Sequence, residues 1–298
     1  MHELIIGTNE AGRRFDRFLQ SYLNRANKSL LHKLLRKKRI KLNGARAYGN
    51  EITAEGDRVA FYISPETLNS LKETLSVSFK NWGDIDIVYE DEHILLVSKP
   101  AGLLTHSNQK ESQDTLVDRI AYYLQSNNFA VTNRLDRNTS GLVACGKNLP
   151  AIQALNTIFA SRKVEKIYFA TVCGKLTGSG HLRGYLYKDE AANRSYIFDT
   201  QKEDTVPVHT EYEVIHTGND FSQVRVRLHT GKSHQIRAHF ASIGHPLVGD
   251  VKYGGKKIAP VTNRNRLQLH CHTFKFLDID IAPLGYLTGM EWSAKNEL

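Results

Sequence analysis

Two runs near the start of the chain place apolar residues at every third or fourth position, as on one face of an amphipathic helix. The first run contains Phe15, Phe18, Leu19, Tyr22 and Leu23, and the second contains Leu30, Leu31, Leu34 and Leu35. Ser29 precedes the second run and is the N-cap that we predict there. The pattern therefore predicts two short helices.

A period of two replaces the helical period after Arg39. Residues 39–42 alternate, and Asn43-Gly44 is the strongest two-residue hairpin signal. Gly56-Asp57 precedes a second strand, predicted over 58–63. We expect a helix pair packed on a small hairpin in residues 1–64. Residues 65–82 contain a helix-breaking Pro65 and no clear period, so they are predicted to be a linker, with one helical turn at most.

Short strand-like runs separated by Gly and Asn turns dominate the chain from Asp84 onward. These runs are IDIVYE, HILLVSK, GLVAC, IYFATVC, EYEVIH, VRVRLH and LHCHTFKFLD. Helical patterns cover 114–125, with Asp114 as the predicted N-cap, 149–162 and 233–242. Many strands with few helices and no regular βαβ rhythm predict an α+β domain over 83–298, with a mixed, mostly antiparallel sheet and a central cleft.

The charge of the chain is concentrated at one end. The 298 residues carry a net charge of +9, and residues 13–60 hold 13 Lys and Arg against four Asp and Glu. All of the excess therefore lies in the first predicted domain, and the other 250 residues are neutral in sum. Such an asymmetry suggests a polyanionic partner.

Cysteine usage and apolar runs narrow the class of protein. The three cysteines lie far apart with no CxxC pair, which excludes a disulfide framework and a four-thiolate metal site. The first residues do not have the pattern of a signal peptide, and no run approaches the roughly 18 apolar residues of a membrane span. We expect a cytoplasmic, monomeric protein that does not bind membranes.

The stretch KSLLHKLLRKKRIK holds seven Lys or Arg and no acid. A run of charge is usually a solvated helix face, but such a face normally carries both signs. A patch of one sign favours contact with the phosphates of a nucleic acid, and few aromatic residues are present for base stacking. The predicted RNA-binding residues are Arg14, Lys28, Lys33, Arg36, Lys37, Lys38, Arg39 and Lys41.

The first 60 residues or so resemble the S4 RNA-binding module. The resemblance rests on RRFDRFLQSYL, on KSLLHKLLRKKRIKLNG and on the Gly-Asp turn of EGDRV. S4 modules occur in ribosomal proteins, aminoacyl-tRNA synthetases and RNA-modifying enzymes. The resemblance therefore implies binding to structured RNA and no particular activity.

An acidic residue stands in a tight turn of the second domain, within TNRLDRNTSGL. Asp136 has an arginine on either side and lies just before the turn Asn138-Thr139-Ser140-Gly141. On spacing alone, the better-supported role is an ordinary capping acceptor, because Asp is common in turns. The two flanking guanidinium groups would nevertheless keep the carboxylate ionised, as a nucleophile requires.

This segment is similar to the central motif, HRLD followed by TSG, of the RluA-type family of pseudouridine synthases. Further blocks follow in family order and span nearly all of the second domain. They are VSKPAG (97–102), VEKIYFA (164–170), TGKSHQIR (230–237), GHPLVGD (244–250) with Tyr253-Gly254, and LQLHCH (267–272).

The resemblance implies a role for each of several residues. Asp136 would be the nucleophile that detaches uracil from its ribose, Tyr168 would pack against the flipped base and help to move its proton, and Arg237 would be the basic partner of Asp136. Arg134 would contact the phosphate backbone or fill the space left by the extruded nucleotide, and Leu269 would form an apolar wall. Without the resemblance, Tyr168 in a strand would be a core residue and Arg237 a surface cation.

Two positions depart from the family pattern. Asn133 stands where the family usually has His, and Lys232 stands where Thr-Gly-Arg is commoner. Asn still offers a donor and an acceptor for orienting the turn, whereas Lys replaces a bidentate fork by a point charge.

The expected function is the conversion of uridine to pseudouridine in RNA, and the target that the S4-like domain favours is large-subunit ribosomal RNA. The alternatives are a transfer-RNA pseudouridine synthase and a non-catalytic S4 protein of RNA binding or ribosome assembly. No cofactor motif is present. Histidines in the second half fit no standard ligand spacing, so no metal is expected; they are His229, His234, His239, His245, His270 and His272.

Overall fold

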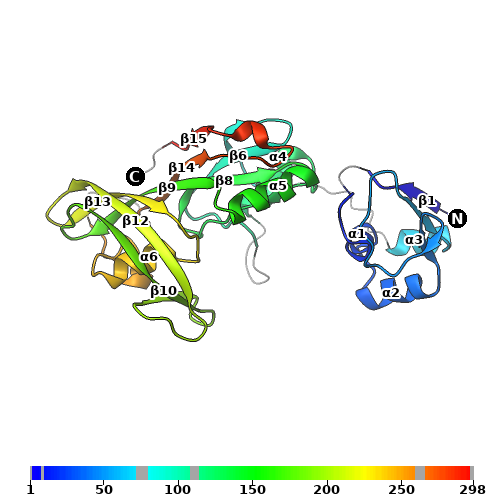
Figure 1. Ribbon diagram of the computed structural model, residues 1–298, viewed down its shortest axis with the longest axis horizontal. Coiled ribbons are helices and arrows are strands. Elements are labelled where there is room, and N and C mark those ends of the chain that lie inside the picture. Colours follow the sequence, from blue (N-terminus) through cyan, green and yellow to red (C-terminus); the bar gives the residue numbers. More distant parts are fainter. Residues whose placement is uncertain (1, 8–9, 72–79, 108–113, 259–265, 296–298) are drawn as a thin grey trace. The chain divides into compact units, whose positions relative to one another are not determined.

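The computed structural model describes residues 2–7, 10–71, 80–107, 114–258 and 266–295. The chain divides into two compact units, of which the first contains the described residues up to 71 and the second contains residues 80–147 and 151–295. Each unit has its own apolar core. They are called the N-terminal unit and the C-terminal unit below (Figure 1).

The N-terminal unit packs three helices on a four-stranded antiparallel sheet of order β1-β4-β2-β3. Its elements are β1 (His2–Ile5), α1 (Phe15–Tyr22), α2 (Lys28–Arg36), β2 (Ile40–Leu42), β3 (Ala45–Arg46), β4 (Arg58–Phe61) and α3 (Pro65–Leu71). The predicted helix pair and hairpin are both present. Asn43 and Gly44 both have positive φ, 51° and 76°, as a two-residue hairpin of this type requires.

Two local predictions in this unit were wrong. The N-cap of α2 is Asn27, whose side chain accepts a hydrogen bond from the Leu30 amide, so the helix begins one residue before Ser29. The first seven residues of the predicted linker form α3. Pro65 suits the first turn of a helix, where its missing N–H is not needed, and Leu68 is buried in the core of the unit.

The C-terminal unit is built on an 11-stranded mixed sheet whose main path runs β11-β10-β12-β13-β9-β14-β8-β6-β5. β15 pairs with β14, and β7 pairs with β8. The strands are β5 (Asp86–Glu90), β6 (Ile94–Lys99), β7 (Ala130–Val131), β8 (Ser140–Gly146), β9 (Val164–Cys173), β10 (Ser179–Asp189), β11 (Arg194–Phe198), β12 (Val206–Thr217), β13 (Phe221–Leu228), β14 (Leu269–Phe276) and β15 (Glu291–Ser293). Only the β8–β14 pair is parallel among the pairs of this sheet, so the predicted mixed, mostly antiparallel α+β fold is confirmed.

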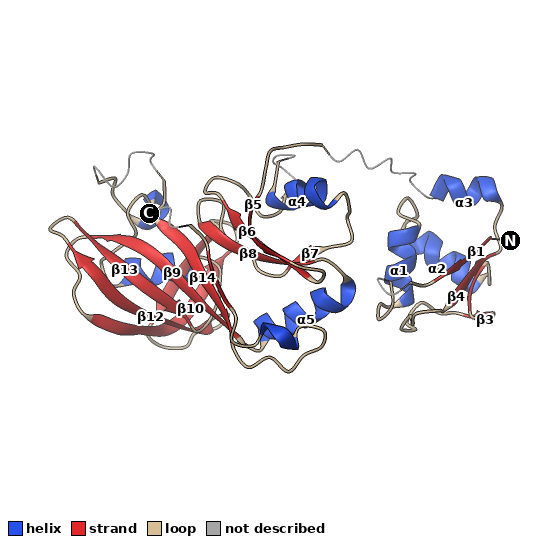
Figure 2. Ribbon diagram, turned by 90° about the horizontal axis from the view of Figure 1, so that it is seen from above, coloured by secondary structure: helices blue, strands red, loops and turns tan. Residues whose placement is uncertain are grey.

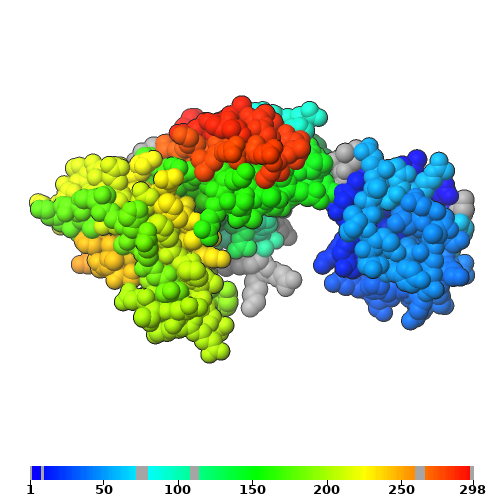
Figure 3. All heavy atoms as spheres, viewed as in Figure 1, coloured from blue at the N-terminus to red at the C-terminus, as the bar shows by residue number. Residues whose placement is uncertain are grey.

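Three α-helices accompany this sheet among the described residues: α4 (Leu116–Leu124), α5 (Leu149–Ala160) and α6 (Gln235–Ser242). Figure 2 shows α4 and α5 on opposite sides of β6 and β8, which explains why every residue of those two strands is buried. Residues 277–295, which follow β14 and are red in Figure 3, are mostly exposed or half-buried. No helix in the described ranges is long and apolar enough to cross a membrane.

The predicted cap of α4 was wrong by one residue. Thr115, not Asp114, caps the helix. Its hydroxyl accepts a hydrogen bond from the Asp118 amide, and the Asp118 carboxylate accepts one from the Thr115 amide, which together form a capping box. Asp114 instead forms an ion pair with Arg119 at 2.9 Å.

Candidate active site

The turn that carries Asp136 ends where β8 meets β14. The Thr139 amide donates to the Asp136 carbonyl at 3.1 Å, and β8 begins at the next residue. Gly141 has a φ of +112°, and a Cβ there would lie 2.1 Å from the Cys271 carbonyl oxygen. Since only glycine allows the backbone of β8 to come this close to β14, the TSG sequence determines where the chain passes from the Asp136 turn into β8.

Lys99 fixes the loop on the C-terminal side of Asp136. Its side chain is fully buried at the end of β6. Its ammonium donates to the carbonyls of Leu103 at 2.8 Å, Pro100 at 3.0 Å and Arg137 at 3.1 Å. Three such bonds offset part of the cost of burying the charge. They also join residues 100–103 to the segment that contains Asp136 and Arg137.

Further bonds join the same two segments. The Gly102 amide donates to the Arg137 carbonyl at 2.8 Å, and Nε of Arg137 donates to the Gly102 carbonyl at 3.1 Å. The Thr105 hydroxyl donates to the Leu135 carbonyl at 3.0 Å. The residues on both sides of Asp136 are therefore held, which positions its carboxylate.

Asn133 uses both ends of its amide. Its Nδ2 donates to the Leu142 carbonyl at 3.2 Å, and its Oδ1 accepts from the Ala144 amide at 2.8 Å. The side chain thus extends the pairing along β8 and orients the segment before Asp136, as its donor and acceptor allow.

Arg237 on α6 lies between two carboxylates. Its Nε and Nη2 donate to Asp250 at 2.7 and 2.8 Å, and its Nη1 donates to Oδ2 of Asp136 at 3.2 Å. Burial alone would lower the pKa of Arg237, but the hydrogen bonds and charges of Asp250 and Asp136 outweigh it and raise that pKa. The side chains of Arg237 and Asp250 are 11% and 2% exposed, so the bidentate pair is a fixed cation beside Asp136.

His234 is the second nitrogen group beside Asp136. It precedes α6 with a φ of +56°, and its Nε2 lies 3.6 Å from Oδ2 of Asp136. Burial lowers the pKa of His234 to about 4, although the charge of Asp136 opposes the shift. The ring is therefore neutral at pH 7, and the contact with Asp136 is not an ion pair.

The tautomer of His234 is linked to Tyr253. The Tyr253 hydroxyl accepts from the Ser195 amide at 2.7 Å and lies 3.0 Å from Nδ1 of His234. If this hydroxyl donates its own proton to Nδ1, the ring proton of His234 lies on Nε2. The Asp136 carboxylate faces a guanidinium and a neutral imidazole.

Tyr168 and Leu269 lie on the neighbouring strands β9 and β14 and are 8% and 4% exposed. Tyr168 is the cross-strand partner of Cys271. Burial, with a smaller contribution from Cys271 and Asp136, raises the pKa of Tyr168 well above its ordinary value. The phenol is therefore protonated at neutral pH, and it offers an aromatic surface rather than a base.

The second-domain residues predicted from the sequence are brought together. Arg134, Asp136, Tyr168, Arg237 and Leu269 all line one cleft of about 1400 Å³. The side chain of Arg134 is exposed there, and its charge adds to burial in lowering the pKa of His106 in the same cleft. The cleft therefore combines an anion, cations and an apolar wall.

The predicted basic residues of the N-terminal unit lie mostly in water. The exposed ones are Lys28, Lys33, Arg36, Lys37, Lys38 and Arg39. Arg14 is exposed and pairs with Asp16 at 2.8 Å, whereas Lys41 is half-buried with its ammonium 5.1 Å from the centre of the Tyr62 ring. A hollow between α1 and α2 is lined by Arg14, Arg17 and Lys28, which makes it cationic.

Sequence reasoning did not select Lys99, His234 or Asp250 as site residues. All three lie within the blocks VSKPAG, TGKSHQIR and GHPLVGD, so the motif boundaries were the available signal. What the sequence could not reveal is that Asp250 binds Arg237 from 13 residues away and that His234 and Arg237 both face Asp136, about 100 residues earlier.

Comparisons with known proteins agree with this geometry. The sequence profile of a family described as RNA pseudouridylate synthase matches residues 93–242. The ribosomal large subunit pseudouridine synthase D of Pseudomonas aeruginosa is 30% identical over 298 residues, covering 95% of this chain and 88% of that protein. An uncharacterized RNA pseudouridine synthase of Bacillus subtilis is 30% identical over 259 residues, covering 85% of this chain and 82% of that protein.

A solved structure is also similar. The human RNA pseudouridylate synthase domain containing 1 matches with a TM-score of 0.58 and 24% identity, over 72% of this chain and 84% of that chain. This match shows a common fold.

Proposed function

The chain belongs to the RNA pseudouridylate synthase family, and from this premise we propose that it converts uridine to pseudouridine in large-subunit ribosomal RNA with Asp136 as the nucleophile. The observation that carries the proposal is that Asp136, Arg237 and Tyr168 line one cleft. An enzyme of this family isomerises uridine: the N1–C1′ bond breaks, the uracil turns, a C5–C1′ bond forms, the C5 proton leaves and N1 takes up a proton. Such an exchange of bonds is internal to the nucleotide, and we expect it to need no cofactor and no metal.

Asp136 is suited to attack because its carboxylate is held and polarised. Arg237 holds a positive charge at 3.2 Å, and its orientation is fixed by Asp250. Positive charge near a carboxylate stabilises its anionic form. The target uridine must leave the RNA stack to reach Asp136, which costs a few kcal/mol that contacts with the backbone must offset.

The remaining cleft residues would hold the flipped nucleotide. Tyr168 offers its ring and Leu269 an apolar wall, since stacking and apolar contact are the usual means of gripping a flipped base. Because the Tyr168 phenol stays protonated, we assign it packing rather than removal of the C5 proton. The exposed guanidinium of Arg134 would bind phosphate or fill the vacated space.

The N-terminal unit would act as an S4-like RNA-binding domain. We propose that it extends through α3 to residue 71, beyond the boundary predicted at 64, and that a catalytic domain follows over 83–298. Exposed cations on and after α2 support contact with phosphates, which is independent of sequence. The working protein is expected to be a cytoplasmic monomer that binds structured RNA.

Release of tritium from RNA labelled at C5 of uridine tests the chemistry. The chain should release tritium from large-subunit ribosomal RNA, and Asp136→Asn should release none at matched protein and RNA concentrations. Asp278→Asn, which removes an exposed carboxylate of the same unit, is the matched control and should keep full activity. Activity in Asp136→Asn would disprove the assigned nucleophile.

Mapping of pseudouridine identifies the substrate. A uridine of large-subunit ribosomal RNA should lose its modification in cells that lack the chain and regain it with the wild type but not with Asp136→Asn. Loss confined to transfer RNA would contradict the ribosomal substrate and leave the chemistry intact. No lost site in any RNA, together with no tritium release, would favour a non-catalytic RNA-binding protein.

A further inference from the structure

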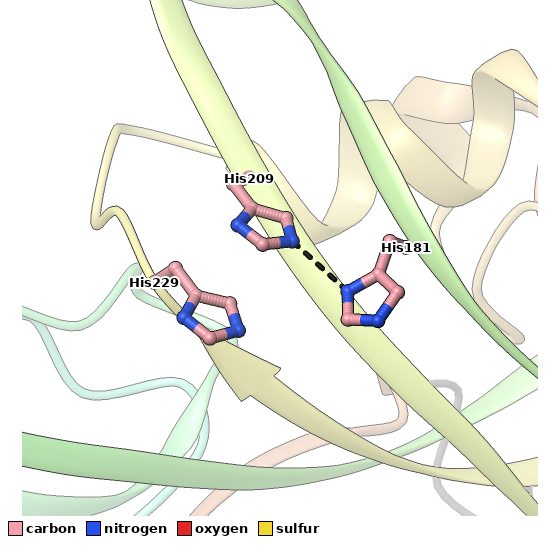
Figure 4. A group of neighbouring side chains, drawn as sticks. All are labelled: His181, His209 and His229. Carbon is pink, nitrogen blue, oxygen red and sulfur yellow. Dashed lines mark hydrogen bonds between the residues drawn. The ribbon is translucent and has the colours of Figure 1, made fainter.

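Three histidines gather on one face of the sheet. His181 lies on β10, His209 on β12, and His229 directly after β13 (Figure 4). Each offers a ring nitrogen, and these three nitrogens all lie within 4.8 Å of one another. This is the single group of three or more such ligands that the described part of the chain contains.

The register explains why they meet. On β10 and β12, His181 is opposite Glu211 and Arg183 is opposite His209, so residues two apart on each strand share a face. The His229 amide bonds to the His209 carbonyl and continues the β12–β13 ladder by one more pair. The three rings therefore project from three adjacent strand positions onto the same face.

The spacing of the rings suits a metal. Nδ1 of His181 and Nε2 of His209 are 3.1 Å apart. Two nitrogens bound to one tetrahedral Zn²⁺ at 2.0–2.1 Å are about 3.3 Å apart, so this pair is close to ligand geometry. The ring of His229 stacks on His209 at 4.1 Å and 9°, and its side chain is 33% exposed, which leaves room for a turn toward the other two.

A carboxylate supports the three histidines from outside the group. Oε2 of Glu211 lies 2.8 Å from Nε2 of His229, which leaves Nδ1 of that ring for an ion. Imidazoles are ligands of the kind that Zn²⁺ and its neighbours in the first transition row accept, and a ligating histidine commonly donates its other ring N–H to a carboxylate. The anion also offsets charge that Arg183 and Arg227 bring to this face.

We propose that His181, His209 and His229 form a binding site for one divalent transition-metal ion, with Zn²⁺ as the best-fitting ion and Glu211 holding the ring of His229. We expected no metal from the sequence because, of these three, His229 alone was among the histidines considered, and because the three are separated by 28 and 20 residues, which is unlike any standard ligand motif. The site is distinct from the uridine chemistry and does not depend on it.

Metal binding would connect two parts of the unit. His229 lines the cleft and directly precedes residues 230–233, which lead to His234 beside Asp136. An ion bound to the three histidines would tie this segment to β10 and β12. Its role would be to order the edge of the cleft, away from the Asp136 carboxylate.

Metal titration of the full-length, tag-free protein tests the site. After treatment with a chelator and its removal, Zn²⁺ should bind with one ion per chain in calorimetry. Co²⁺ should give the visible absorption of a tetrahedral nitrogen–oxygen site. His209→Ala should weaken Zn²⁺ binding at least tenfold, whereas His216→Ala, which removes an exposed histidine elsewhere on β12, should leave it unchanged.

Two further variants keep the test independent of folding. His181→Asn changes an exposed side chain and should weaken binding as His209→Ala does, with the apo protein unfolding at the wild-type temperature. Glu211→Gln should weaken binding by roughly 10–100-fold. Absence of one-to-one binding in the wild type, or equal affinity in His209→Ala and His181→Asn, would overturn the proposal.

Discussion

In the N-terminal unit, the cations assigned to RNA stand in water on α2 and the turn after it, whereas in the C-terminal unit Arg237 is almost buried between two carboxylates. Exposed charges attract phosphates over several ångströms and their contributions add, so RNA affinity depends more on the number of such charges than on the exact position of each. A buried charge acts on one neighbour at a fixed distance. The first unit is thus suited to attraction, and the second to chemistry.

The largest expected effect comes from adding one methyl group at a glycine of each unit, which compares a buried turn with an exposed one. Gly141→Ala would place a Cβ 2.1 Å from the Cys271 carbonyl, where β8 and β14 are both buried, and should cost more than about 4 kcal/mol of the free energy of unfolding. Gly44→Ala in the N-terminal hairpin meets nothing within 4 Å and should cost about 1–2 kcal/mol for its positive φ. Urea unfolding measures the free energy of unfolding of both variants. Equal losses would contradict the difference in packing between the two turns.

The position of a single cation is tested next. Asp250→Asn leaves Arg237 in place but weakens the bidentate pair that orients it. We expect kcat for pseudouridine formation to fall about 100-fold, as for a small misplacement of a reacting group, with the Kd for RNA unchanged. Asp280→Asn, at an exposed carboxylate, is the control. A weaker Kd with an unchanged kcat would assign Asp250 to RNA binding instead.

Buried histidines should make the C-terminal unit sensitive to mild acid. Burial lowers the pKa of His239 to about 4, from an ordinary value near 6.5. The unfolded chain therefore takes up the proton first, so this contribution to stability is complete above pH 6.5 and is lost as the pH falls toward 4.

Urea unfolding at pH 7 and pH 5.5 measures the effect of that histidine. His239→Gln should remove about 1 kcal/mol of the stability that the wild type loses between the two values. If wild type and variant lost the same stability between pH 7 and pH 5.5, His239 would have the same pKa in the folded and unfolded states.

The exposed cations of the N-terminal unit provide the last test of the comparison. Changing Arg36, Lys37, Lys38 and Arg39 to Gln should weaken RNA binding about tenfold at physiological salt and flatten its salt dependence, since each phosphate contact contributes about 0.7–0.9 to the slope of log K against log salt. Saturating kcat should not change. Arg36→Lys with Arg39→Lys keeps the charge and should behave like the wild type. Equal salt slopes in the two variants would show that these cations do not contact phosphate.

Strand periodicity and motif blocks predicted most of the C-terminal sheet, because buried strands such as β6 and β8 are apolar along their whole length. β10 and β11 were not predicted. β10 contains Gly180 and Gly184, which interrupt its alternation of apolar and polar residues as turn residues would. In the structure, a Cβ at Gly184 would lie 2.9 Å from the side chain of Ile197 on β11. Glycine there serves close approach within a sheet, which a local pattern cannot distinguish from a turn.

The candidate site was predictable as a set of residues and not as an arrangement. Asp136 and Arg237 followed from motif resemblance, but the orientation of Arg237 depends on Asp250, and the proton on His234 depends on Tyr253. Such dependence arises from tertiary hydrogen bonds between segments that no periodicity connects. The same holds for His181, His209 and His229, which meet only through strand register.

The place of β14 in the sheet has a consequence for how the protein is made. This strand, one of the last in the chain, lies between β9 and β8 near the middle of the sheet. While a ribosome has yet to release residues 269–276, the strands on either side cannot be joined through it, and Leu269 is not yet beside Tyr168. A nascent chain can therefore already contain Asp136 and its arginines and still have no pocket. Completion of the cleft depends on contacts distant in sequence, which form slowly, so catalytic competence should appear only after residues 269–276 have left the ribosome.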